Sequence, residues 1–153
     1  MALSQRAEGH VKRTLFAVGF MCLSACSGAD GPSRNEYNAK ANALCARYNN
    51  QLARLGQPSG PIEQQVEQTR RINRITLKEI HELRSITPPK PDQRYLANLY
   101  DRGEKAIGLA NQSADDVERG DKSKANADAT QAATELAQVN DALESFGAKE
   151  CAR

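Results

Sequence analysis

Apolar and small residues recur at steps of three and four along most of the chain, which is the spacing of one face of an α-helix. Between Ser33 and Gly56 this stripe consists of Tyr37, Ala41, Leu44, Cys45, Tyr48, Leu52 and Leu55. Ser33 and Glu36 have the spacing of a capping box, so the first helix is predicted to begin directly after Ser33. Gly56 and the Pro-Ser-Gly-Pro segment 58–61 are expected to end it.

A second helix is predicted from about residue 62 to residue 86. Its inward stripe would be Ile62, Val66, Thr69, Ile72, Ile75, Thr76, Ile80 and Leu83. The prolines of segment 87–91 should stop this helix, because proline lacks an amide proton and restricts the residue before it.

Two more helices follow in the second half of the chain. Asp92 is expected to cap the third helix, whose stripe is Leu96, Tyr100, Gly103, Ile107, Ala110, Ala114 and Val117. Gly120 and Asp121 break the pattern, and the fourth helix begins at about Ser123. Its stripe is Ala129, Ala132, Leu136, Val139, Leu143 and Phe146, and Gly147 should close it.

The predicted fold class is all-α. Four helices of about 20–25 residues joined by short loops predict an antiparallel, up-down-up-down four-helix bundle. Alternating runs of β-branched residues, which indicate strands, do not occur. Small residues should let the third and fourth helices approach closely: Gly103, Ala110, Ala114, Ala129 and Ala132.

The first 25 residues have the pattern of a bacterial signal peptide. A polar stretch ends in Lys12 and Arg13, and an apolar run of about ten residues follows, well short of the roughly 20 that span a bilayer. The run ends in Leu23-Ser24-Ala25-Cys26, which resembles the lipobox of bacterial lipoproteins. That resemblance implies cleavage before Cys26 and a diacylglyceryl group on its sulfur, with acyl chains such as palmitate. Two other readings stay open, namely cleavage after a different small residue and an uncleaved anchor.

The lipobox divides the chain into a signal peptide (1–25), a lipidated tether (26–33) and a helical-bundle domain (34–153). More than one acyl chain holds a protein on a membrane far more firmly than a single chain does. The expected location is therefore extracytoplasmic and lipid-anchored at the cell membrane, or at the outer membrane if the host has two.

Two cysteines remain once the signal peptide and the lipid have used Cys22 and Cys26. In an up-down bundle, the start of the first helix and the end of the fourth lie at the same end, so Cys45 and Cys151 are expected to form a disulfide. The alternative is a pair of free thiols in a redox or metal site. The sequence has neither the C-x-x-C motif nor the histidine beside these cysteines that such a site would need.

The formal charge of the full chain is +2, but residues 1–25 contribute three basic residues and one acidic residue. Of the 21 basic and 19 acidic residues in the chain, 18 of each remain in the mature part. A balanced charge of this kind lacks the basic excess that displaces counterions from phosphates, so no nucleic-acid partner is expected.

Three clusters of polar residues are candidates for chemistry. Arg70, Arg71, Arg74 and Lys78 form a basic patch on the second helix, read either as a salt-bridged surface or as a contact for anionic lipids or wall polymers. Asp115, Asp116, Glu118 and Asp121 gather carboxylates that lack the spacing of a calcium loop and in part cap the fourth helix. His81-Glu82 begins like a zinc-protease motif, but Ser85 stands where the second histidine would be.

Four features occur in the same order in a group of proteins known to us only as uncharacterised. They are Tyr37-x-Ala39-x-Ala41-x-x-Leu44-Cys45, Leu83-x-x-Ile86-Thr87-Pro88-Pro89, Gly120-Asp121 and Gly147-x-x-x-Cys151. They resemble small helical lipoproteins and secreted proteins of high-GC Gram-positive bacteria. The resemblance implies a helical bundle in the cell envelope and carries over no catalytic residue.

The function expected from these patterns is that of a non-catalytic interaction or structural module of the cell envelope. Its partners would be the membrane, through Cys26, and an envelope protein or wall polymer. No enzymatic activity, cofactor or metal is expected. The alternative is a carrier or sensor that binds a small molecule between its helices, with Thr69, Thr76 and Asn140 as polar contacts.

Overall fold

The computed structural model describes residues 31–152, which form four long helices and two short 3-10 helices. The long helices are α1 (Arg34–Ala53), α2 (Ile62–Ser85), α3 (Gln93–Glu118) and α4 (Lys122–Phe146). The short ones are η1 (Lys90–Asp92), which leads into α3, and η2 (Lys149–Cys151), which follows α4. The predicted all-α class is confirmed, and residues 31–152 contain no strand. The predicted signal peptide and the lipidation site at Cys26 lie outside the described residues.

Several helices begin and end where the sequence predicts. The backbone N–H of Ser33 donates to Glu36 Oε2 at 2.8 Å, and Ser33 Oγ accepts the Glu36 N–H at 3.2 Å, so the capping box is formed. Asp121 Oδ1 accepts the N–H of Lys124 at 3.0 Å and caps α4. Gly147 ends α4 with φ +102°, a conformation that residues with a side chain rarely adopt.

Asp92 differs from the prediction. It occupies the cap position of α3, but its carboxylate makes no bond to the helix amides. Both of its oxygens instead accept from Arg34 of α1, with Nη2 to Oδ1 at 2.6 Å and Nε to Oδ2 at 3.1 Å. The expected side-chain cap is therefore wrong, because a two-pronged bond to a guanidinium is stronger than a bond to one backbone amide.

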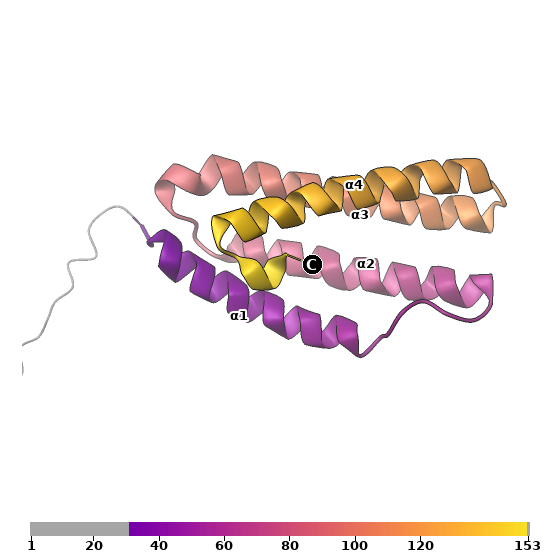
Figure 1. The fold of residues 1–153 in the computed structure, drawn as a ribbon, viewed down its shortest axis with the longest axis horizontal. Helices are drawn as coiled ribbons and strands as arrows, with labels where there is room; N and C mark the ends of the chain where they lie inside the picture. The colour runs from indigo at the N-terminus through magenta and orange to yellow at the C-terminus, as the bar shows by residue number, and fades with distance from the viewer. Residues whose placement is uncertain (1–30, 153) are drawn as a thin grey trace, which may run out of the picture.

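The four long helices lie side by side (Figure 1). α3 packs against both α2 and α4, and α1 packs against α2. The short η2 lies between the C-terminal end of α4 and α1 and packs on both (Figure 1). α1 has 20 residues, fewer than the 24 to 26 of the other long helices, so the first turns of α2 extend beyond its end (Figure 1).

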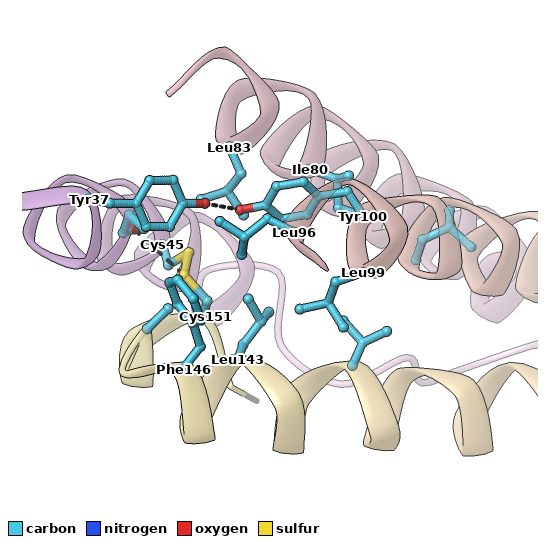
Figure 2. Packing of buried hydrophobic residues seen from close by; sticks show 14 residues of the cluster. Tyr37, Cys45, Ile80, Leu83, Leu96, Leu99, Tyr100, Leu143, Phe146 and Cys151 are labelled. Atoms are coloured by element: carbon cyan, nitrogen blue, oxygen red, sulfur yellow. Dashed lines mark hydrogen bonds between the residues drawn. A yellow bond between two sulfur atoms is a disulfide. The ribbon is translucent and has the colours of Figure 1, made fainter. Parts of the chain in front are cut away.

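The core gathers side chains of all four long helices and η2, as Figure 2 shows. The Tyr37 ring of α1 meets the Phe146 ring of α4 edge-on, with ring centroids 5.8 Å apart. The hydroxyl of Tyr37 also forms a hydrogen bond with the hydroxyl of Tyr100 on α3 (Figure 2). Burial raises the pKa of both tyrosines, so these hydroxyls stay protonated and paired over the whole physiological range.

The predicted stripes needed correction at three positions. Ile62 is 52% exposed, because it begins α2 beyond the end of α1. Ala129 is exposed rather than inward on α4. Gly103 does not serve the contact of α3 with α4, since a Cβ atom there would lie 3.1 Å from Ile80 Cδ1 of α2. The missing side chain therefore makes room for a neighbour on a different helix.

Candidate ligand-binding cavity

A cavity of about 240 Å³ lies between the long helices. Most of its wall is apolar, and its sides come from α1, α2, α3, α4 and η2. The lining residues are Leu52, Ile72, Thr76, Glu79, Ile80, Leu83, Leu99, Tyr100, Gly103, Leu136, Val139, Asn140, Leu143 and Cys151.

η2 packs against both α1 and α4 beside the cavity. Cys151 of η2 forms part of the wall and is joined to Cys45 of α1, with the two Cα atoms 5.1 Å apart. Figure 2 shows this disulfide beside Leu143, with Leu99 and Tyr100 across from it. The predicted Cys45–Cys151 disulfide is thus confirmed, and it fastens one wall of the cavity.

Hydrogen bonds from α1 hold the chain segment that carries η2. Asn38 Nδ2 donates to the carbonyl of Phe146 at 2.9 Å, and Asn49 Nδ2 donates to the carbonyl of Glu150 at 2.8 Å. Asn42 lies between them and bonds to the same segment through both ends of its amide. The three asparagines and Cys45 lie on one face of α1, at steps of four, three and four residues.

Besides Tyr100, three polar side chains line the cavity. Thr76 and Glu79 are three residues apart on α2, so they share a face of that helix, and Asn140 comes from α4. Glu79 is only 3% exposed, so its side chain is buried between the packed helices. The wall therefore combines apolar surface with hydroxyl, carboxyl and amide groups, as small-molecule sites do.

The cavity adjoins a surface groove at the end of α1. Leu52 and Ile72 line both spaces, and the groove is completed by Asn49, Ala53, Gly56 and Gln57. The short length of α1 leaves this groove open between its last turn and α2.

α1 is also tied to α2 near the cavity by a polar cluster. The Tyr48 hydroxyl donates to Glu82 Oε1 at 2.6 Å, and Arg47 donates to Glu82 Oε2 at 2.6 Å. Burial, followed by the bond to Glu82, raises the pKa of Tyr48 to about 12. The phenol therefore acts as a stable hydrogen-bond donor that fixes the spacing of the two helices.

The four predicted basic residues do not form one open patch. Arg70 reaches across to α3, where it donates to Asp115 Oδ1 at 2.6 Å and to Glu118 Oε1 at 2.7 Å. Arg74 pairs with Glu67 at 3.0 Å. Arg71 and Lys78 are exposed on the same helix. Two of the four cations are thus engaged by carboxylates of the chain itself.

The predicted acidic cluster is divided among structural contacts. Asp116 is 1% exposed and binds both Arg119 and Lys124, the latter at 2.8 Å. These bonds, led by the one from Lys124, hold the pKa of Asp116 below its usual range. With Asp115 and Glu118 on Arg70 and Asp121 capping α4, each of the four carboxylates has a partner in the fold.

His81 lies on the surface, with Nε2 3.6 Å from Glu104 Oε1. Among residues 31–152, no group of three or more histidine, cysteine or acidic side chains is arranged to hold a metal ion. Within the same residues, no helix is long and apolar enough to cross a bilayer.

The sequence identified the cavity only in part. Thr76 and Asn140 line it, whereas the hydroxyl of Thr69 bonds to the carbonyl of Gln65 at 2.8 Å, away from the lining. Glu79 was missed, although it follows Thr76 by three residues and precedes Leu83 by four. Its place in the stripe was a signal, but a charged residue is normally assigned to the surface.

No protein-family model matches the chain, and comparisons with the curated proteins and with the solved structures found no match. The functional argument therefore rests on the residues and on the geometry of the cavity.

Proposed function

We propose that this chain is a lipid-anchored, extracytoplasmic module of the bacterial cell envelope without catalytic activity. The observation that carries this proposal is the buried Cys45–Cys151 disulfide, since such bonds persist in oxidising compartments outside the cytoplasm. The signal-peptide pattern of residues 1–25 and the lipobox ending in Cys26 support the same extracytoplasmic location.

In this proposal the domain is an antiparallel, up-down-up-down four-helix bundle. The connections between its long helices are short, and each long helix packs on the next one along the chain. The disulfide then fixes the C-terminal segment to α1. A rigid, charge-balanced body of this kind suits docking to an envelope protein or a wall polymer, with exposed Arg71 and Lys78 as candidate contacts.

The proposed lipid attachment to the membrane is tested by replacing single cysteines of the N-terminal segment. In a bacterium that processes lipoproteins, Cys26→Ser should release the protein from the membrane fraction. Cys22→Ser is the matched control and should leave the protein in that fraction, because Cys22 belongs to the cleaved peptide. Equal membrane retention of both variants contradicts lipidation at Cys26.

The cavity favours a second function, the binding of a small molecule as a carrier or sensor. An apolar protein cavity of roughly 150 Å³ stays dry and holds a benzene-sized molecule. The cavity of this protein is larger, at about 240 Å³, and also presents polar groups from two helices. This second function is compatible with a location in the cell envelope, because a carrier or sensor can also be lipid-anchored.

Cavity binding is tested with toluene, an apolar probe without a polar head. Toluene should raise the melting temperature of the detergent-free full chain, because a ligand that binds only the folded state stabilises it. Leu136→Phe narrows the cavity and should abolish the shift. Ala133→Phe adds the same ring at an exposed position of α4 and should keep it. A missing shift in the unaltered chain contradicts the second function and leaves the envelope address intact.

A further inference from the structure

One end of the domain carries an exposed aromatic ring close to the point where the chain enters the domain. We propose that this end lies against a phospholipid bilayer, with Tyr95 at the level of the lipid headgroups and Arg94 on their phosphates. The inference rests on the lipid anchor at Cys26 proposed above, and it adds a second contact between the protein and the membrane.

Three helix ends meet at this surface, on the left of Figure 1. Arg34 at the start of α1 donates two hydrogen bonds to Asp92, the residue directly before α3. Its guanidinium carbon also lies 4.7 Å from the ring centroid of Phe146, the last residue of α4. The Phe146 ring stacks on the ring of Tyr95 in the first turn of α3, with centroids 5.9 Å apart. These contacts hold Tyr95 in place although its ring is at the surface.

The chain enters the domain beside the same surface. A Cβ atom on Gly31 would lie 3.9 Å from Lys90 Cγ, so Gly31 lies next to η1, which leads into α3. Cys26 precedes Ser33 by seven residues. Because an extended chain spans at most about 3.6 Å per residue, the cap of α1 lies within about 25 Å of the lipidated residue. The surface around Tyr95 is therefore within reach of the bilayer.

Exposure distinguishes Tyr95 from the other tyrosines. Its side chain is 45% exposed, whereas Tyr37, Tyr48 and Tyr100 are at most 5% exposed. Among residues 31–152, the other exposed large hydrophobic side chain is Ile62 at the start of α2, on the right of Figure 1. A helix of 24 residues is about 36 Å long, so Ile62 lies far from the chain entry. A single exposed apolar residue is common, and the distinctive feature of Tyr95 is its place beside the anchored segment.

The side chains of this surface suit the boundary between water and lipid. Tyrosine combines an apolar ring with a polar hydroxyl and is enriched at membrane interfaces. Side chains in the first turn of an α-helix lean toward its N-terminal end, so Arg94 and Tyr95 both lean over the end of the domain. Arg94 is exposed, and a guanidinium binds phosphate oxygens through paired hydrogen bonds.

The contact does not require an anionic membrane. Phosphate groups occur in zwitterionic phospholipids as well as in anionic ones. Exposed Glu36 in the first turn of α1 and Glu144 in the last turn of α4 offset the cations at this end. We therefore expect binding to bilayers of neutral lipid.

The lipid anchor makes a weak contact sufficient. A tether converts the second contact into an intramolecular one, with an effective concentration set by the length of the tether. One aromatic ring and one cation should not hold the domain on a bilayer without this help. The unlipidated Cys26→Ser protein should therefore stay in solution when vesicles are added.

The test uses tryptophan fluorescence, because the sequence contains no tryptophan. Tyr95→Trp places one reporter on this surface, and an indole keeps an aromatic ring against Phe146. The lipidated protein is reconstituted in phosphatidylcholine vesicles with and without brominated acyl chains, which quench tryptophan at the bilayer. We expect the emission of the Tyr95→Trp variant to move to shorter wavelength on the vesicles and to lose intensity with brominated lipid. Ile62→Trp is the matched control, and its emission should change in neither way.

A second measurement uses the unaltered tyrosine. Of the four tyrosines in the chain, Tyr95 is the exposed one, so enzymatic iodination of the Cys26→Ser protein should modify it selectively. The iodinating enzyme cannot enter the bilayer. Iodination of Tyr95 should therefore be lost when the lipidated protein is on vesicles, and mass spectrometry of the peptides measures this loss. Adding the same vesicles to the Cys26→Ser protein should leave the iodination unchanged.

The outcomes distinguish the two proposals. A protein that does not stay with the vesicles overturns the lipid anchor, and the membrane contact falls with it. A protein that stays on the vesicles while the Tyr95→Trp variant is not quenched and Tyr95 is iodinated overturns the contact alone. In that case the surface is free for a protein partner. Equal quenching of the Tyr95→Trp and Ile62→Trp variants overturns the assignment of the contact to this end of the domain.

Discussion

The side chain of Asn42 on α1 binds the backbone of Glu150 in η2: the Glu150 N–H donates to Asn42 Oδ1 at 2.9 Å. The Nδ2 group of the same amide donates to the carbonyl of Gly147 at 3.2 Å. One side chain thus bridges the two ends of the turn that leads from α4 into η2. Because Cys151 follows Glu150 directly, this contact also positions the cysteine that forms the disulfide and lines the cavity.

Replacing Asn42 by alanine should therefore destabilise the domain by about 1–3 kcal/mol, because two partner groups lose their hydrogen bonds. Urea denaturation measures the change. Asn50→Ala, at an exposed position of the same helix, is the control and should stay within about 0.5 kcal/mol of the unaltered chain. Equal effects of the two substitutions would show that the contact to η2 contributes nothing to stability.

Removing the disulfide with the double variant Cys45→Ala and Cys151→Ala should cost about 4–5 kcal/mol, since it releases a loop of 106 residues in the unfolded chain. The measurement is chemical denaturation under oxidising conditions. The unaltered chain with its disulfide reduced should show a similar loss. A loss below about 1 kcal/mol in both samples contradicts this role of the disulfide.

Two glycines of α3 should respond differently to alanine. Gly108 has nothing within 4 Å of where a Cβ would lie, so Gly108→Ala should stabilise the domain by up to about 1 kcal/mol through helix propensity. At Gly103 the new methyl group would lie 3.1 Å from Ile80 Cδ1. Gly103→Ala should therefore stabilise the domain less than Gly108→Ala does, or destabilise it. Thermal unfolding of the two variants side by side measures this difference in stability. A larger gain at Gly103 than at Gly108 contradicts the close packing of α2 on α3.

Asp116 should make the domain sensitive to acid. Its pKa is lowered in the folded state by Lys124 and Arg119, so its contribution is fully present above the unfolded pKa of about 3.9 and is lost as the pH falls through the lowered value. Asp116→Asn should be less stable at neutral pH and should show a shallower loss of stability between about pH 5 and pH 2.

The control for this profile is Asp141→Asn, at an exposed position of α4. It should keep the pH dependence of the unaltered chain. An unchanged acid profile for Asp116→Asn would show that the contacts with Lys124 and Arg119 do not stabilise the folded domain.

The helix ends illustrate what could be predicted from the sequence. Ser33, Asp121 and Gly147 act on the backbone within four residues of themselves, so local spacing suffices to recognise them. Asp92 has the same local signal but binds Arg34, 58 residues away. A local pattern carries no information about such a partner.

The candidate site was harder to predict for a related reason. Asn42 and Glu79 interrupt the apolar stripes of their helices, and a polar residue in such a place reads as a surface position. Asn42 is inward because the 3-10 helix η2 presents its backbone there, and hydrophobic periodicity does not predict so short an element. Glu79 is buried on the wall of a cavity that exists only once residues from α1, α2, α3, α4 and η2 are packed together.

The central proposal is a lipid-anchored domain of the cell envelope, and its second candidate function is the binding of a small molecule in the cavity. Native mass spectrometry of the protein extracted gently from its own membrane tests both most directly. The account predicts a chain that begins at Cys26, carries a diacylglyceryl group, contains one disulfide and has a bound small molecule, which Leu136→Phe loses. A chain that retains residues 1–25, carries no lipid and has no bound molecule would contradict it.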